Sequence, residues 1–263
     1  MAAAEPDAAS SFTFTPLSDD KAFPSLKTTE ARDALSKWNL DPFMQAKTFR
    51  FDHHFSAEQA DAFLHDFFGS SAVQAAAPVC VGTGGKWGQL GAVSTGAVKH
   101  ARLPTTVLRM DFFARLDEAG VVRAGDISKC FDVQCGDVLV SDRLRKLLLD
   151  ESDEDWDLFS AAERNELIFH LMRRLAVGGG MNQWDDAFAP YLALTKALYK
   201  DFVSVSKVAG KLQISSQTYQ VTSIDGSSAA LFPRPGPHNF CYVTVDPLAR
   251  HVKLWYAAWF PMM

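Results

Sequence analysis

The chain has 263 residues and a mass of 29.0 kDa, and 26 basic against 31 acidic residues give a formal net charge of −5. A chain of this length can bury about 73% of its extended surface, so it can fold without disulfides or metals. The acidic balance excludes a protein whose main task is to neutralise nucleic-acid phosphates or anionic lipids, because such proteins carry clustered excess Lys and Arg.

The N-terminal residues 1–11 are small, polar and Ala-rich, so we expect them to be disordered. They lack the basic and apolar regions of a signal peptide. No segment approaches the ~18 uninterrupted apolar residues of a membrane span. Four cysteines are too few for a disulfide scaffold in a chain this long, which predicts a reduced, cytosolic protein. We expect residues 12–263 to form one domain, with a possible division near the acidic run 150–157.

Helices are predicted wherever an N-cap precedes an apolar stripe with helical spacing. Ser56 and Gln59 have capping-box spacing, and apolar residues then recur every three or four positions as far as Gly69. Ser160 and Glu163 form a second such box. Four or five packed helices are expected, over residues 28–38, 56–69, 141–149, 160–177 and 185–202.

Strands are predicted where apolar and polar residues alternate between turn signals. The predicted segments are 12–17, 49–51, 87–93, 106–112, 138–140, 212–215, 219–224, 240–245 and 252–259. The last two flank a turn at residues 246–250 and should form a hairpin. Both faces of the final segment are apolar, so it should lie inside the fold. The sequence therefore predicts an α+β fold, mainly antiparallel, with its C-terminal β-hairpin in the core.

The motifs that could carry chemistry are incomplete. The Gly-rich segment Gly82–Gly88 fails the dinucleotide fingerprint, because Trp87 occupies the position of the third glycine, and it also fails the P-loop pattern. Cys130 and Cys135 lack the second pair of ligands that a zinc site needs. We predict no catalytic, cofactor-binding or metal-binding residues. An enzyme or a nucleotide- or metal-binding protein that uses the Gly-rich turn or the Cys pair stays the alternative.

The acidic run is the strongest charge feature. It can be a solvated loop, or a contact for a basic partner with Trp156 as the anchor. On the second interpretation, neutralising its five carboxylates should weaken partner binding and leave folding intact. The candidate partner surface consists of Asp150, Glu151, Asp153, Glu154, Asp155 and Trp156.

Several blocks in a fixed order carry a resemblance to a known family. They are Phe49-x-Phe51-Asp52, Asp111-Phe112-Phe113-x-Arg115-Leu116, Lys129-Cys130-x-Asp132-x-x-Cys135, Ser141-Asp142-x-Leu144-Arg145, Pro190-Tyr191-Leu192-x-x-Thr195-Lys196-x-x-Tyr199-Lys200-Asp201-x-Val203-Ser204-Val205 and Val245-Asp246-Pro247-x-x-Arg250-His251. With these blocks the chain, from about Phe12 onward, resembles the cilia- and flagella-associated protein 300 family.

The resemblance implies a cytoplasmic protein that also reaches the axoneme of the cilium or flagellum. It implies an adaptor or scaffold, without chemistry of its own, in the assembly of inner and outer axonemal dynein arms. The implied partners are PIH-domain assembly factors of the kintoun class and axonemal dynein subunits, with no nucleic acid and no membrane. A structural component of the axoneme is the second alternative.

Overall fold

The computed structural model describes residues 11–18, 23–81, 86–93, 96–226 and 229–259. The predicted disorder of residues 1–11 and the Gly-rich turn at 82–85 therefore lie almost entirely outside the described part. Within it, six antiparallel strands form the main sheet in the order β1-β2-β14-β13-β12-β5. Their bounds are β1 Phe14–Pro16, β2 Met44–Phe51, β5 Lys99–Leu103, β12 Gln217–Ser223, β13 Phe240–Asp246 and β14 His251–Ala257.

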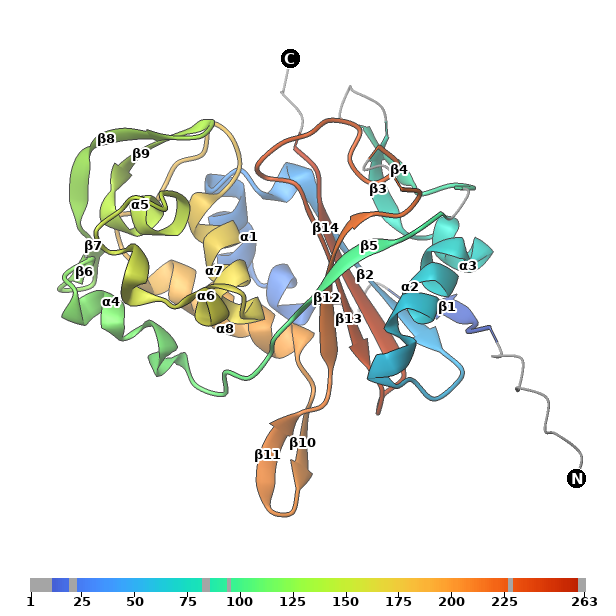
Figure 1. Cartoon of the computed structure of the whole chain (residues 1–263). Coiled ribbons are helices and arrows are strands. Elements are labelled where there is room, and N and C mark those ends of the chain that lie inside the picture. The colour runs from blue at the N-terminus through green and yellow to red at the C-terminus, as the bar shows by residue number, and fades with distance from the viewer. Residues whose placement is uncertain (1–10, 19–22, 82–85, 94–95, 227–228, 260–263) are drawn as a thin grey trace, which may run out of the picture.

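Helices cover both faces of this sheet, so the molecule has three layers (Figure 1). One face packs against α1 (Thr29–Lys37), α5 (Arg143–Leu149), α7 (Leu167–Val177) and α8 (Ala189–Phe202) in the larger apolar cluster. The other face packs against α2 (Ala60–Gly69) and α3 (Ser71–Gln74) in a cluster rich in phenylalanine rings. The α+β prediction is confirmed. The sheet is the middle layer, and the side chains of its two faces enter two separate apolar cores.

The C-terminal hairpin lies at the centre of the sheet, as predicted. β14 pairs with β13 on one side and with β2 on the other. Leu254 and Tyr256 enter the phenylalanine-rich cluster, whereas Trp255 enters the larger cluster on the opposite face. Asp246 begins the turn: its Oδ1 accepts hydrogen bonds of 3.0 Å from the N–H groups of Leu248 and Ala249. The alternation of side chains along a strand thus divides this segment between both cores.

Helices are present at all five predicted places, with the caps that the sequence indicates, but the one predicted over 160–177 is divided at the extended residue Glu166 into a short helix and α7. The Thr28 side chain accepts from the N–H of Ala31 at the start of α1, and Asp142 accepts from the N–H of Arg145 at the start of α5. The described residues contain eight α-helices because three further helices have only four residues each, too few to show a periodicity. These are α3, α4 (Arg115–Glu118) and α6 (Ala161–Arg164).

The predicted strand over 106–112 is wrong. The strand in this region is β5, and it ends at Leu103 because Pro104 follows and cannot donate to a ladder. After Pro104, the backbone N–H and the hydroxyl of Thr106 both donate to the Glu166 carboxylate. This carboxylate takes the place that a neighbouring strand would have as hydrogen-bond partner. The predicted strand over 87–93 is also too long, because β4 covers only Lys86–Gln89.

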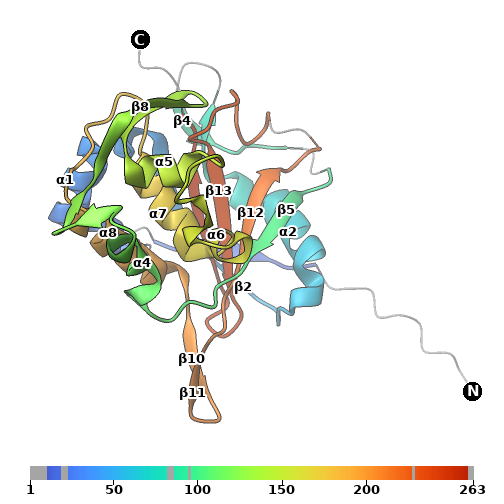
Figure 2. The same ribbon diagram turned by 60° about the vertical axis from the view of Figure 1, so that its left-hand side comes forward.

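Four small two-stranded sheets complete the described part. They are β3–β4 (Pro78–Val81, Lys86–Gln89), β6–β7 (Val122–Arg123, Asp126–Ile127), β8–β9 (Lys129–Cys135, Val138–Asp142) and β10–β11 (Val205–Val208, Lys211–Ile214). The β10–β11 hairpin projects away from the three layers in both views (Figures 1 and 2). The expectation of one domain over residues 12–263, with a possible division near 150–157, stays a prediction.

Candidate partner-binding surfaces

The acidic run lies between α5 and α6, and part of it is already neutralised within the chain. Asp153 is buried, and its Oδ2 lies 2.7 Å from Nζ of Lys146 on α5. This hydrogen bond raises the pKa of Lys146. Asp155 pairs with Arg143, the first residue of α5, at 2.5 Å. Two carboxylates of the run therefore tie the loop to the preceding helix and are unavailable to a partner.

The remaining members of the run divide between local contacts and solvent. The guanidinium carbon of Arg164 lies 3.4 Å from the ring centroid of Trp156, so one face of this half-buried indole is covered within the chain. Asp150 accepts from the N–H and hydroxyl of Ser152. Glu151 and Glu154 are exposed. The carboxylates of the candidate surface that have no basic partner among the described residues are thus Asp150, Glu151 and Glu154.

Because Asp153 is buried and paired, we now expect that neutralising all five carboxylates would also affect the fold. Replacing Asp153 with Ala removes the acceptor for Lys146 and for the N–H of Asp155. We expect a loss of about 1.5–3 kcal/mol in the free energy of unfolding, as for a hydrogen bond to a charged group. Glu154→Gln, one position along and exposed, should leave the melting temperature unchanged. Equal melting temperatures for the two variants would show that the Asp153 pair is not structural.

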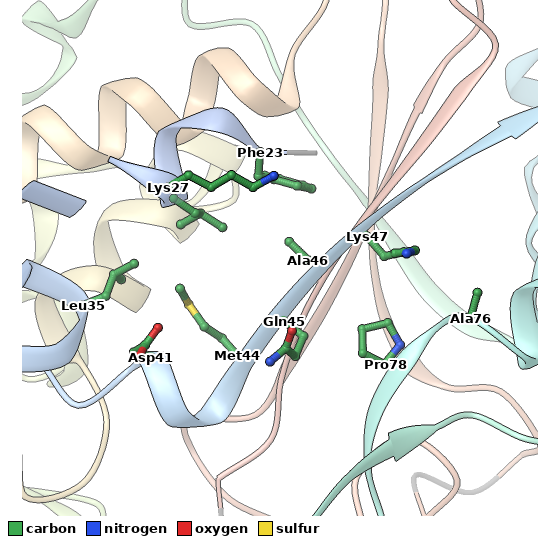
Figure 3. A pocket seen from close by; sticks show the side chains of 11 residues that line it. Phe23, Lys27, Leu35, Asp41, Met44, Gln45, Ala46, Lys47, Ala76 and Pro78 are labelled. Atoms are coloured by element: carbon green, nitrogen blue, oxygen red, sulfur yellow. The ribbon is translucent and has the colours of Figure 1, made fainter. Parts of the chain in front are cut away.

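A cavity of about 380 Å³ opens beside β2, between that strand and the segment that contains Phe23 and Lys27 (Figure 3). Met44 lies near its middle, and Asp41 stands at one end. The lining mixes apolar side chains with two ammonium groups and one carboxylate. Among the described residues, this lining contains no cysteine, serine or histidine, so it offers no thiol, no serine hydroxyl and no imidazole.

The sequence motifs tested for metal chemistry do not gather in the structure. Among the described residues, no three His, Cys, Asp or Glu side chains form a group that could hold an ion. All four cysteines are free. Burial raises the pKa of both Cys130 and Cys135, which disfavours the thiolate that binds zinc. Elsewhere, the Nδ1 atom of His53 lies 2.7 Å from Oδ1 of the neighbouring Asp52.

A buried charge that the sequence analysis missed joins the helices of the larger core. Arg145 has a side chain only 2% exposed and pairs with Asp142 at 2.7 Å. Its other nitrogens donate to the Ala176 carbonyl and to the hydroxyl of Tyr191 on α8. The guanidinium also stacks on Trp184 at 4.4 Å. Each of the three guanidinium nitrogens thus has a hydrogen-bond acceptor, and the network joins α5, α7 and α8 within the helical layer.

Comparison with known proteins decides the family. The profile for "Cilia- and flagella-associated protein 300" matches residues 11–257. A protein of that name from Chlamydomonas reinhardtii is 37% identical over 244 residues, which cover 90% of this chain and 94% of the relative. The chain belongs to the cilia- and flagella-associated protein 300 family. A second member, from Paramecium tetraurelia, is 31% identical over 253 residues, covering 92% of this chain and 90% of the relative. No solved structure matches the chain.

The blocks on which the family resemblance rests fall on identifiable parts of the fold. The longest, Pro190–Val205, comprises α8 and the entry into the projecting hairpin. The block from Ser141 to Arg145 contains the buried ion pair, and the last block is the turn of the C-terminal hairpin. Across the described residues, no helix is long and apolar enough to cross a bilayer.

Proposed function

We propose that this protein is a non-catalytic adaptor in the assembly of inner and outer axonemal dynein arms, working in the cytoplasm and reaching the cilium. The observation that carries the proposal is the family match over residues 11–257, together with relatives named for cilia and flagella along nine-tenths of the chain. An adaptor acts by presenting surfaces. Its partners, on this proposal, are PIH-domain assembly factors of the kintoun class and axonemal dynein subunits.

Exposed apolar side chains support an interaction role. Phe131 on β8 is 94% exposed and Leu139, on the neighbouring β9, is 55% exposed. The projecting hairpin adds Val205 and Leu212, at 49% and 59%. Large apolar side chains that stand on small two-stranded sheets outside both cores can be buried by a partner without any change to the fold.

A null strain tests the proposal in the cell. We expect cilia of near-normal length that beat poorly or not at all, because arm assembly fails while the microtubule scaffold still forms. Electron microscopy of axoneme cross-sections should show depletion of both inner and outer dynein arms. Restoration by the reintroduced gene is the control. A full set of both arms in the null strain would remove the assembly assignment.

Fractionation separates the adaptor from a structural component of the axoneme. An assembly adaptor should be recovered mostly in the cytosolic fraction and be washed from axonemes by salt, since it acts before or during transport. Retention in salt-washed axonemes, at a fixed ratio to tubulin, would favour the structural alternative.

The non-catalytic part of the proposal has its own measurement. A ligand at one hundred times its dissociation constant adds ~2.7 kcal/mol to the free energy of unfolding, which is readily seen in a thermal melt. We expect no such shift with ATP, GTP or NAD. Stoichiometric zinc by metal analysis, or a clear stabilisation by any of these nucleotides, would instead support the Gly-rich turn or the Cys pair as a binding site.

A further inference from the structure

Two neighbouring cavities lie at the base of the projecting hairpin and share Ile214 as a common wall. The first, of about 190 Å³, lies among the 107–110 segment, α7, α8 and the hairpin. The second, of about 460 Å³, lies between the 102–106 segment and residues 214–217. We call the surface of these two cavities, lined by Ile168 and by residues within 102–110, 196–205 and 214–217, the basic trough.

The floor of the trough is apolar. The smaller cavity is lined by Val107, Ile168 and Val203, and it opens beside the exposed side chains of Leu108 and Val205. Its volume is below the ~300–1,000 Å³ of clefts that hold small-molecule ligands, so it suits a protruding apolar side chain better than a cofactor. One wall is Tyr199, whose buried hydroxyl has no hydrogen-bond partner among the described residues.

The charged side chains that line the trough are basic. Arg109, Lys196 and Lys200 line the smaller cavity and Arg102 the larger, and no Asp or Glu among the described residues lines either. Lys207 and Lys211 stand on the hairpin above. None of these six cations has an ion-pair partner within the part of the chain that the structure describes.

Three acidic residues stand close to the lining residues along the chain. Asp111, two positions after Arg109, is exposed and lines neither cavity. Asp201, next to Lys200, accepts a hydrogen bond from the N–H of Ser25. Glu166 is buried, and its carboxylate is held by Thr106. Within the described ranges the basic rim is therefore not neutralised, unlike the acidic run, whose carboxylates Asp153 and Asp155 already have basic partners.

We propose that the basic trough binds an acidic segment of a partner protein, which inserts an apolar side chain between α8 and the β10–β11 hairpin. This inference rests on the proposed adaptor role and names the chemistry of one partner. Buried apolar contact would supply the affinity, and the unpaired cations would select negative charge and accelerate association at low salt. The protein has a net charge of −5, so most of its surface would repel an acidic partner, and the basic patch would orient that partner toward the trough.

A defined peptide tests the trough directly. The probe is a fluorescein-labelled peptide in which Glu and Asp alternate with Leu and Phe at helical spacing, measured by fluorescence anisotropy with the full-length protein. Matched peptides carry Lys in place of the acids, or Ser in place of the apolar residues. We expect the acidic apolar peptide to bind at least ~10-fold more tightly than either, with affinity falling as salt rises. Hydrogen exchange should slow at 102–110 and 203–217.

Two variant pairs separate a site from general attraction. Lys196→Glu with Lys200→Glu should weaken peptide binding ~10-fold or more, because both residues line the trough. Arg32→Glu with Lys86→Glu makes the same change in net charge at exposed positions elsewhere and should have little effect. If the first pair lowers the melting temperature, Lys196→Ala with Lys200→Ala replaces it. Equal weakening by both pairs, preference for the Lys peptide, or no binding of the acidic peptide would overturn the proposal.

The failure of this inference can be told apart from failure of the adaptor role. A null strain that regains dynein arms with the wild-type gene but not with the Lys196→Glu, Lys200→Glu gene supports both. Full recovery of arms with this variant would overturn the trough as the functional docking site and leave the adaptor role standing. Normal arms in the null strain itself would remove the adaptor role, whatever the peptide does.

Discussion

Deletion of residues 252–263 is expected to abolish cooperative folding. β14 is an inner strand, hydrogen-bonded on both edges, and its removal leaves β13 and β2 without their shared neighbour. It also removes Trp255 from one core and Leu254 and Tyr256 from the other. Burial of each large apolar side chain contributes roughly 1.5–3 kcal/mol. Together these losses approach the ~5–15 kcal/mol net stability of a typical domain.

The measurements are solubility, near-UV circular dichroism and a thermal melt. We expect the truncated protein to be insoluble, or compact without fixed side-chain packing. A matched control shortens the projecting hairpin by replacing residues 206–213 with Asn-Gly. The hairpin pairs only with itself, and its base stays closed by the hydrogen bond from the Ser215 N–H to the Ser204 carbonyl. This control should melt cooperatively near the wild-type temperature. A soluble, cooperatively melting truncation would show that β14 is peripheral.

Replacement of Arg145 by Met is expected to cost about 3–5 kcal/mol, because it leaves the buried Asp142 carboxylate without its cation. For a chain of this size that corresponds to a fall of roughly 6–20 °C in the melting temperature. The hydroxyl of Tyr191 and the carbonyl of Ala176 also lose their donor. Differential scanning calorimetry is the measurement, and Arg32→Met, on an exposed face of α1, is the control.

The double variant Asp142→Asn, Arg145→Met distinguishes the charge effect from lost packing. Removing the carboxylate as well should restore part of the stability, because a buried pair costs most when only one partner is missing. A double variant no more stable than Arg145→Met would show that the loss comes from packing against Trp184 and Tyr191 instead. An Arg145→Met variant as stable as the wild type would contradict the structural role of the network.

Local signals were sufficient wherever a segment's neighbours in sequence determine its structure. The capping box at Ser56, the stripe from Ala60 to Phe68 and the turn after Asp246 all have the predicted geometry. The two apolar faces of residues 252–259 indicated an inner strand because a strand covered on both sides needs apolar residues at every position. The α+β class followed from the order in which helical and strand periodicities occur along the chain.

Local signals failed where a distant residue supplies the deciding contact. Alternation over 106–112 predicted a strand, but the Glu166 carboxylate, from the start of α7, takes the hydrogen bonds of Thr106. In the sequence, Asp153 is indistinguishable from the solvated acids beside it, yet in the structure it is buried and paired with Lys146. A charge pattern shows which residues carry charge, whereas the packing of other segments determines which of them are desolvated and paired.

By itself the sequence determined the fold class, the main helices, the inner position of the last strand and the family to which the chain is similar. These depend on periodicity, caps and ordered motifs, all of which are local along the chain. Only the tertiary structure decided which charges are free. It neutralised Asp153 and Asp155, buried Arg145, and assembled the basic trough by bringing the 102–110 segment against the distant residues that flank the β10–β11 hairpin. Ion pairing and exposure depend on which segments pack against one another, and a local sequence pattern does not specify which distant segments these are.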